Sequence, residues 1–246
     1  MENYNGKVAM VTGSSAGIGA AISKALVKRG MKVVGLARRV EKLGDLKKQV
    51  SKEPGQFYGV KCDIRNEKDI IGAFEWVEKN LNGVDVLINN AGLMKDTNLT
   101  DGDTEKWRTV FDTNVVGLCI ATREAVKSMK KRNVPGHVIH INSIAGHRIH
   151  PGMAHLSNVY SGSKFAVRAL AETLRLELEH HKLKIKVSNI SPGYVKTEFF
   201  SASGYGVPEA FKDIAHLNPE DLADAVIYAL SAPSNVNVSE ITLLPI

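Results

Sequence analysis

The chain has 246 residues, of which 43% are hydrophobic and 24% are charged. This length and balance are typical of one large folded domain with a sizeable core, and they exclude a mostly disordered chain. The net charge of +6 is spread along the sequence, and no basic surface interleaved with aromatic residues accompanies it, so no nucleic-acid partner is expected.

Targeting signals and metal-binding patterns are absent from the sequence. No apolar run approaches the roughly 18 residues of a membrane-spanning helix, and residues 1–7 are too polar for a secretory signal peptide. Cys62 and Cys119 form no C-x-x-C pair, and the histidines have no clustered acids or thiols beside them. We therefore expect a cytoplasmic protein with no membrane span, no disulfide framework and no metal.

Strand-like and helix-like segments alternate along the chain. Short apolar runs rich in β-branched residues predict strands at residues 7–12, 32–37, 57–62, 84–89, 137–142, 185–190 and 240–244. Helical spacing and capping residues predict helices at 18–28 before Gly30, at 67–80 between Asn66 and Gly83, from a capping Thr104 to about Lys131, at 165–178, and after Asn218-Pro219. Continuously apolar strands indicate a sheet that is covered on both faces. The alternation predicts an α/β fold: one doubly wound, Rossmann-type domain over residues 1–246, with a seven-stranded parallel sheet and helices on both faces.

Residues 199–217 form the loosest segment. Glycines and serines surround the aromatic residues Phe199, Phe200, Tyr205 and Phe211. This composition is typical of a mobile flap over an apolar cavity, and equally of a plain surface connection.

A glycine-rich turn follows the first predicted strand. Thr12 to Gly19 reads T-G-S-S-A-G-I-G and leads directly into the first predicted helix. In this context Gly13 permits the sharp turn, Gly17 lets the backbone approach a pyrophosphate, and Gly19 allows close packing of helix and strand. The alternative, glycines that only make a turn, is disfavoured because strand and helix flank the motif in the required order.

The end of the second strand indicates which dinucleotide is preferred. An NAD-binding protein usually carries an acid here, whereas this chain has Ala37 followed by Arg38 and Arg39. A guanidinium group binds a 2′-phosphate through paired charged hydrogen bonds, and an acid would repel it. The two arginines could instead be solvated surface residues, but the missing acid favours NADP(H).

A tyrosine and a lysine four positions apart are candidates for acid–base chemistry. In a helix, Tyr160 and Lys164 share one face, and a nearby ammonium group lowers the pKa of a phenol. Ser143 follows a predicted strand and so lies at the edge where open α/β sheets bind ligands. Asn114 is a poor helix former inside a predicted helix, which favours a water-bridged or functional role.

These motifs together resemble the short-chain dehydrogenase/reductase family, and the resemblance covers nearly the whole chain. The glycine turn, Asp63, the N-N-A-G sequence that ends at Gly92, Asn114, Ser143, Y-x-x-x-K, and Pro192-Gly193 with Thr197 follow the order of that family. Within the family, the chain resembles insect NADP-dependent farnesol dehydrogenases and vertebrate relatives that reduce ketosteroids and other carbonyls.

The resemblance implies a role for each matching residue. Tyr160 would be the acid–base group, Ser143 would orient the substrate oxygen, Lys164 would lower the Tyr160 pKa and bind the nicotinamide ribose, and Asn114 would hold a water that links Lys164 to solvent. The cofactor-binding residues expected from the motifs and the resemblance are Gly13, Ser15, Gly17, Ile18, Gly19, Arg38, Arg39, Asp63, Ile64, Asn90, Ala91, Gly92, Tyr160, Lys164, Pro192, Gly193, Val195 and Thr197. The resemblance also implies a homodimer or homotetramer built on the long helices.

Two features depart from the family pattern. Ser143 and Tyr160 lie farther apart along the chain than in many members, because the segment from Arg148 to Asn158 is longer. Ser14 and Ser15 stand where some NADP enzymes add a base, which leaves phosphate recognition mainly to Arg38 and Arg39.

The predicted activity is NADP(H)-dependent hydride transfer to or from a lipophilic alcohol or carbonyl: a farnesol-like terpenoid, a ketosteroid, or another ketone or aldehyde. Largely apolar pocket candidates favour such a substrate over a sugar. They are Leu93, Met94, Ile144, Tyr194, Phe199, Phe200 and Tyr205. The alternative is a catalytically silent NADPH-binding sensor or scaffold, which would have no need of the Ser143, Tyr160 and Lys164 set.

Overall fold

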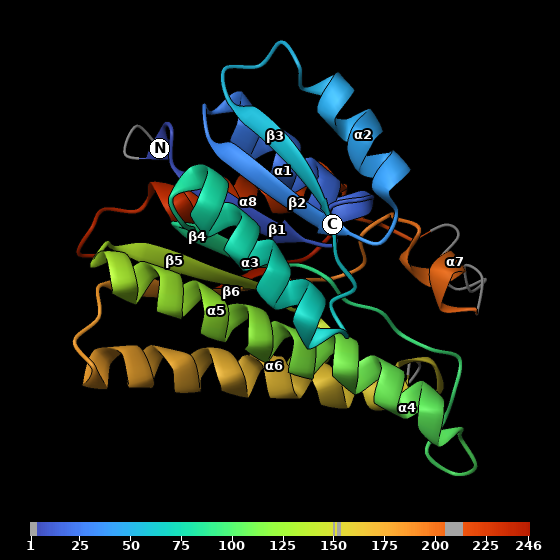
Figure 1. Cartoon of the computed structure of the whole chain (residues 1–246). Helices are drawn as coiled ribbons and strands as arrows, with labels where there is room; N and C mark the ends of the chain where they lie inside the picture. Colours follow the sequence, from blue (N-terminus) through green and yellow to red (C-terminus); the bar gives the residue numbers. More distant parts are fainter. Residues whose placement is uncertain (1–3, 150, 152–153, 205–213) are drawn as a thin grey trace.

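Seven parallel strands form one sheet in the order β3-β2-β1-β4-β5-β6-β7 (Figure 1). The structure is a computed structural model that describes residues 4–149, 151, 154–204 and 214–246; of residues 154–157 it describes the backbone alone. The strands are β1 (Val8–Thr12), β2 (Lys32–Ala37), β3 (Gln56–Lys61), β4 (Val86–Asn89), β5 (Gly136–Ile141), β6 (Ile185–Pro192) and β7 (Glu240–Leu243). The helices are α1 (Gly17–Lys28), α2 (Val40–Gln49), α3 (Glu67–Leu81), α4 (Thr104–Phe111), α5 (Gly117–Arg132), α6 (Ala154–His180), α7 (Phe199–Ser203) and α8 (Pro219–Ser231), with a π-helical turn η2 (Asp112–Val116) and a 3-10 turn η3 (Ile144–Gly146). The predicted fold class is confirmed.

Helices cover both faces of the sheet (Figure 1). Side chains from α1, α2 and α8 pack with Ala9 and Val11 of β1 on one face, and side chains from α3, α5 and α6 pack with Val8 and Met10 on the other. Successive side chains of a strand point to opposite faces, so a strand buried on both sides needs apolar residues at every position. This requirement explains the continuous apolar runs in the sequence. Among the helices in the described part of the chain, none is long and apolar enough to cross a membrane.

The order of the strands determines where a ligand can bind. Strand β1 pairs with β2 on one side and with β4 on the other, so the chain changes direction across the sheet at β1. The loops that leave β1 and β4 therefore separate at their carboxyl ends and open a crevice between them. The glycine turn after Thr12 and the segment after Asn89 both lie at this crevice.

The predicted long helix from Thr104 to about Lys131 is wrong in two respects. Asp103 is the N-cap, because its carboxylate accepts a hydrogen bond from the Glu105 amide at 2.8 Å. The helix is also interrupted by the π-helical turn at residues 112–116, which brings Asn114 into a buried position. Turns of this kind occur frequently at functional sites.

The segment predicted as a flap, residues 199–217, is described only in part. Residues 199–203 form α7, and Val195 pairs with Leu217 in an isolated parallel bridge. Residues 205–213, which include Tyr205 and Phe211, lie outside the described residues.

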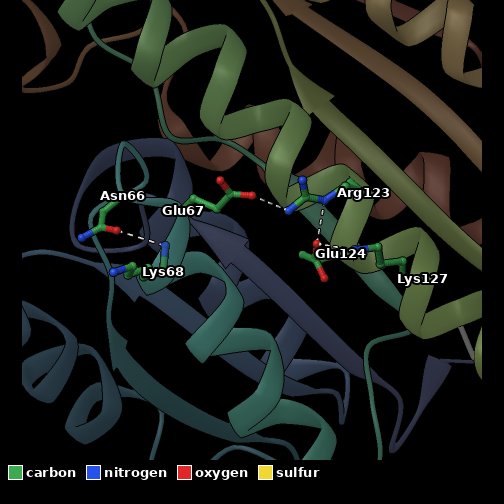
Figure 2. A network of polar contacts seen from close by, with 6 residues as sticks. All are labelled: Asn66, Glu67, Lys68, Arg123, Glu124 and Lys127. Carbon is green, nitrogen blue, oxygen red and sulfur yellow. Dashed lines mark hydrogen bonds and ion pairs between the residues drawn. The ribbon is translucent and has the colours of Figure 1, made fainter.

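Polar contacts at the start of α3 hold it in place and connect it to α5 (Figure 2). The side chain of Asn66 accepts a hydrogen bond from the Lys68 amide at 3.0 Å and caps α3. Arg123 of α5 contacts Glu67 at 2.8 Å and Glu124 at 2.7 Å. The cap satisfies a backbone donor, whereas Arg123 and its partner Glu67 are exposed to solvent, and the two interactions should differ in strength and in salt dependence.

We expect Asn66→Ala to lower the free energy of unfolding by about 1 kcal/mol, because it leaves a backbone donor of α3 without its side-chain partner. Arg123→Ala should cost less, about 0.5 kcal/mol, because exposed ion pairs are screened by water. Urea unfolding at low and high salt checks both: high salt should remove most of the Arg123 effect and leave the Asn66 effect. Equal salt sensitivity of the two variants would contradict this assignment.

Candidate active site

The carboxyl ends of the central strands open into a cavity of about 940 Å³. The predicted site residues that line it are Gly13, Ser15, Gly17, Ile18, Arg38, Arg39, Asp63, Ile64, Asn90, Ala91, Gly92, Ser143, Tyr160, Lys164, Pro192, Gly193, Val195 and Thr197. Most of these residues follow the ends of strands β1 to β6, Tyr160 and Lys164 lie in α6, and the parallel sheet brings them all to one edge. Of the predicted site residues, Gly19 and Asn114 are not part of the cavity wall.

The glycine turn holds the N-terminus of α1 against the cavity. Gly13 and Gly17 have φ angles of +71° and +54°, which side-chain-bearing residues rarely adopt. A Cβ atom at Gly13 would lie 3.0 Å from the Cα atom of Ala91, and one at Gly19 would lie 2.4 Å from Nδ2 of Asn90. The backbone therefore packs closely on the loop after β4, and the free amides at the start of α1 lie beside the cavity, as a phosphate-binding helix requires.

A threonine that we did not predict as a site residue joins the two sides of the crevice. The hydroxyl oxygen of Thr12 accepts hydrogen bonds from the amides of Asn90 at 3.0 Å and Ala91 at 2.9 Å. The Asn90 side chain in turn donates to the Thr12 carbonyl oxygen at 2.9 Å. The only signal in the sequence is the position of a hydroxyl residue at the end of a strand, directly before the glycine turn.

The arginines after β2 lie at the mouth of the cavity, where Arg39 has two partners. Its guanidinium group donates from Nη2 to the Ser15 hydroxyl at 3.1 Å and pairs with the Glu198 carboxylate at 3.4 Å. Arg39 therefore spans from the glycine turn to the residue just before α7. No sequence pattern indicated Glu198, because its contact with Arg39 joins residues 159 positions apart.

Asp63 is held by Arg65. Two side-chain hydrogen bonds, of 2.7 and 3.1 Å, join the guanidinium group to the carboxylate. These bonds lower the pKa of Asp63 below its usual range, with smaller contributions from the Arg65 amide and the charge of Arg38. Asp63 is thus kept as a carboxylate acceptor beside the cavity.

These features fit a dinucleotide. The N-terminus of α1 can solvate a pyrophosphate, Asp63 offers an acceptor to a base, and Arg38 and Arg39 supply positive charge at the end of β2. A side chain at Gly13 or Gly17 would be strained, and one at Gly19 would clash with the Asn90 side chain and the Gly13 backbone, so the close turn depends on these glycines.

Tyr160 and Lys164 project from one face of α6 toward the end of β5. The ammonium group of Lys164 donates to the carbonyl oxygen of Ile141 at 2.9 Å, and it lies 5.8 Å from the centre of the Tyr160 ring. Ser143 follows β5 by two residues, and its hydroxyl accepts a hydrogen bond from the Ala145 amide at 3.1 Å. That acceptor bond leaves the hydroxyl proton of Ser143 available to the Tyr160 oxygen, and the Ser143 hydroxyl favours a lower pKa of Tyr160.

Burial has the largest effect on the pKa values of Tyr160 and Lys164. Desolvation raises the pKa of Tyr160 to about 12, and the hydrogen bond from Ser143 opposes only part of this rise. Desolvation also lowers the pKa of Lys164 to about 8. The lowered pKa expected for Tyr160 is therefore not found in the protein alone. At neutral pH, the phenol holds its proton and the lysine is charged.

Asn114 does not line the cavity, but its side chain holds the backbone of Leu93, which does. Its Oδ1 atom accepts from the Leu93 amide at 2.8 Å, and its Nδ2 atom donates to the Leu93 carbonyl oxygen and to the Ser163 hydroxyl, both at 2.9 Å. Ser163 donates to the carbonyl oxygen of Tyr160 at 2.7 Å. Asn114 is thus connected to the backbone of Tyr160 through one hydroxyl.

The remaining part of the cavity is largely apolar. Of the predicted pocket residues, Leu93, Met94, Ile144, Tyr194, Phe199 and Phe200 line it, and Tyr205 lies outside the described residues. The ring of Phe199 lies 5.6 Å from the ring of Tyr160, so this apolar region adjoins the phenol directly.

Comparisons with known proteins agree with this geometry. The family model described as short chain dehydrogenase matches residues 7–205. The chain is 47% identical to a farnesol dehydrogenase of Aedes aegypti, over 100% of this chain and 98% of that protein. It is 46% identical to dehydrogenase/reductase SDR family member 11 of Gallus gallus, over 100% of this chain and 98% of that protein.

Solved structures show the same fold. The closed form of a serine dehydrogenase complexed with NADP+ superposes with a TM-score of 0.86, at 32% identity and over 96% of this chain and 94% of that chain. An actinorhodin polyketide ketoreductase variant with NADPH gives a TM-score of 0.84 at 28% identity, over 100% of this chain and 97% of that chain. The resemblance predicted from the motifs is confirmed: this chain belongs to the short-chain dehydrogenase family of oxidoreductases.

Proposed function

We propose that this protein is an NADP(H)-dependent oxidoreductase that interconverts a lipophilic alcohol and its carbonyl compound. The observation that carries the proposal is that Tyr160, Lys164 and Ser143 meet in one cavity with the glycine turn and two arginines. A catalytically silent dinucleotide sensor needs the glycine turn and the arginines but has no use for the other three groups.

The preference for NADP(H) rests on the charges after β2. Ala37 lines the cavity where an acid would contact a ribose, and Arg38 and Arg39 offer guanidinium groups to a 2′-phosphate. Glu198, the ion-pair partner of Arg39, is exposed, and the distance of 3.4 Å between the two charged groups is long. A phosphate can therefore replace the Glu198 carboxylate. The solved relatives with bound NADP+ or NADPH are consistent with this choice.

In carbonyl reduction, the residues of this chain deliver a proton and stabilise the charge that remains. When bound, NADPH supplies the hydride to the carbonyl carbon. Ser143 orients the substrate oxygen, and Tyr160 transfers its hydroxyl proton to that oxygen. The charge of Lys164 stabilises the resulting phenolate, and Lys164 would also hold the nicotinamide ribose. The reverse reaction uses the phenolate as the base.

A proton relay behind Lys164 is consistent with the position of Gly92. A Cβ atom at Gly92 would lie 3.5 Å from Oδ1 of Asn114 and 3.8 Å from Nζ of Lys164. Gly92 thus borders the space between these two groups. A water in that space would receive one hydrogen bond from Lys164 and donate one to Asn114, which is the relay role proposed for Asn114.

The apolar region beside Tyr160 supports a terpenoid, a ketosteroid or another lipophilic ketone or aldehyde as substrate. The 47% identity to a farnesol dehydrogenase favours the terpenoid. We further propose a homo-oligomer built on the long helices, because Phe111, Val116, Phe165 and Leu176 leave 38% to 51% of their surfaces exposed on α4, η2 and α6.

Tyr160→Phe should reduce kcat by roughly 10²- to 10⁴-fold, because it removes the proton donor and little volume. NADPH oxidation with a panel of lipophilic ketones and aldehydes measures the loss, and NADPH affinity from fluorescence titration should stay within about twofold. A wild-type protein that binds NADPH but oxidises it with no member of the panel would support the silent sensor instead.

Ala37→Asp should move the cofactor preference toward NADH. A carboxylate beside a 2′-phosphate costs on the order of 1 to 3 kcal/mol, so the ratio of kcat/KM for NADPH to that for NADH should fall roughly 10- to 100-fold. Ala37→Asn has a similar size without the charge and is the control. An unchanged ratio in the Asp variant, or an equal fall in both variants, would contradict the placement of the phosphate.

The pH dependence of carbonyl reduction should follow Lys164. Its pKa of about 8 means that the positive charge is present at neutral pH and is lost as the pH rises. Since that charge stabilises the phenolate left after proton transfer, kcat/KM should fall above about pH 8. Lys164→Arg keeps its charge to much higher pH, so the fall should move upward even where the rate itself is lower. A fall at the same pH in both proteins would refute the assignment to Lys164.

A further inference from the structure

We propose that Asn158 is a positioning residue that sets the direction of the Tyr160 side chain and holds the loop after β4, which lines the same cavity, at a fixed distance from Tyr160. This inference rests on the proposed function, because it gives Asn158 a part in the reaction that Tyr160 performs. No sequence motif pointed to Asn158, which lies two residues before Tyr160.

The backbone of Asn158 adopts an unusual conformation inside α6. Its φ and ψ angles are 28° and −124°, and the helix is kinked at this position. The other positive-φ asparagines among the described residues, Asn82 and Asn133, lie at the C-caps of α3 and α5 with ordinary left-handed angles. Conformations such as that of Asn158 persist only where the surrounding structure holds them, and they are found most often at functional sites.

The Oδ1 and Nδ2 atoms of Asn158 each form a short hydrogen bond. Oδ1 accepts a hydrogen bond from the Val159 amide at 2.6 Å, which stabilises the turn of the backbone directly before Tyr160. Nδ2 donates to the carbonyl oxygen of Thr97 at 2.7 Å, which reaches the loop after β4. One side chain therefore connects the start of the Tyr160 helix to a segment 61 positions away.

That loop contributes Leu93 and Met94 to the wall of the cavity that Tyr160 also lines, and it is held at both ends. At its start, the backbone of Leu93 is bound by Asn114, and Leu93 and Met94 line the cavity. At its end, the Thr97 hydroxyl accepts from the Trp107 indole at 3.1 Å, in addition to the contact from Asn158. Asn158 thus links the wall that would face the substrate to the helix that carries the phenol.

The alternative is that Asn158 is needed only for folding. A purely structural residue would change the amount of folded protein, and the surviving folded protein would have normal turnover. A positioning residue changes the reaction in protein that still folds and binds NADPH. The test must therefore separate kcat from NADPH binding and must include a readout of Tyr160 itself.

The variants are Asn158→Ala, which loses both hydrogen bonds and strains the backbone, Asn158→Gly, which keeps the positive φ, and Asn158→Asp, which keeps only the acceptor for Val159. Asn133→Ala is the matched control: it places the same substitution at a positive-φ asparagine in the cap of α5. We expect Asn158→Ala to lower kcat at least tenfold with one NADPH site per chain retained. Asn158→Gly and Asn158→Asp should each recover part of that loss, and Asn133→Ala should stay within twofold of the wild type.

The second readout does not need turnover. Ionisation of Tyr160 is followed from the ultraviolet absorbance of tyrosinate, as the difference between each protein and the same protein carrying Tyr160→Phe. We expect the midpoint to move in Asn158→Ala and to stay in place in Asn133→Ala. A wild type without turnover would refute the proposed function, and the ionisation midpoint would still decide the role of Asn158.

The proposal is overturned if Asn158→Ala keeps both kcat and the Tyr160 midpoint at the values of Asn133→Ala. It is also overturned if kcat per NADPH site is normal in Asn158→Ala, since the loss would then reflect unfolded protein only. If Asn158→Ala does not fold, Asn158→Asp decides: wild-type kcat and midpoint in that variant would show that the contact with Thr97 has no part in the reaction.

Discussion

The hydrogen bond from the ammonium group of Lys164 to the carbonyl oxygen of Ile141 joins α6 to the end of β5. Ser143 lies two residues beyond that carbonyl, and Tyr160 lies one helical turn before that lysine. Because β5 and α6 are both rigid, this contact fixes the distance between the serine hydroxyl and the phenol. The proposed acid–base set depends on this contact, since a shift of α6 by one residue would move Tyr160 to another face.

Burial gives the same site its electrostatic character. Removing water raises the pKa of Tyr160 and lowers that of Lys164, because both charged forms lose solvation. The neutral phenol is the form that donates a proton, and the lysine remains charged at neutral pH. In the proposed mechanism, the neutral phenol is the proton donor of carbonyl reduction, whereas alcohol oxidation requires the phenolate to be stabilised by further positive charge.

Two irregular helical segments support the wall around the phenol. The π-helical turn at residues 112–116 places Asn114 against Leu93, and the kink at Asn158 places a side chain against Thr97. Regular helices at these positions would present their side chains differently and would leave the backbone of the loop without these partners. Local departures from ideal helix geometry are thus concentrated where the cavity wall has to be held.

Much of the fold and of the candidate site could be predicted from the sequence by itself. Buried strands are apolar at every position, and the glycines mark backbone conformations that other residues rarely adopt, so the individual strands, the turn at Gly13 and the placement of Tyr160 and Lys164 on one helix face are local properties of the chain. Only the tertiary structure decided the interruption of the long helix at Asn114, the link from Thr12 to Asn90, the contact between Arg39 and Glu198, and the raised pKa of Tyr160. Most of these contacts join residues far apart in the chain, and the pKa depends on how much water is excluded. Neither quantity is encoded in the spacing of residues along the sequence, because both arise only when separate segments pack together.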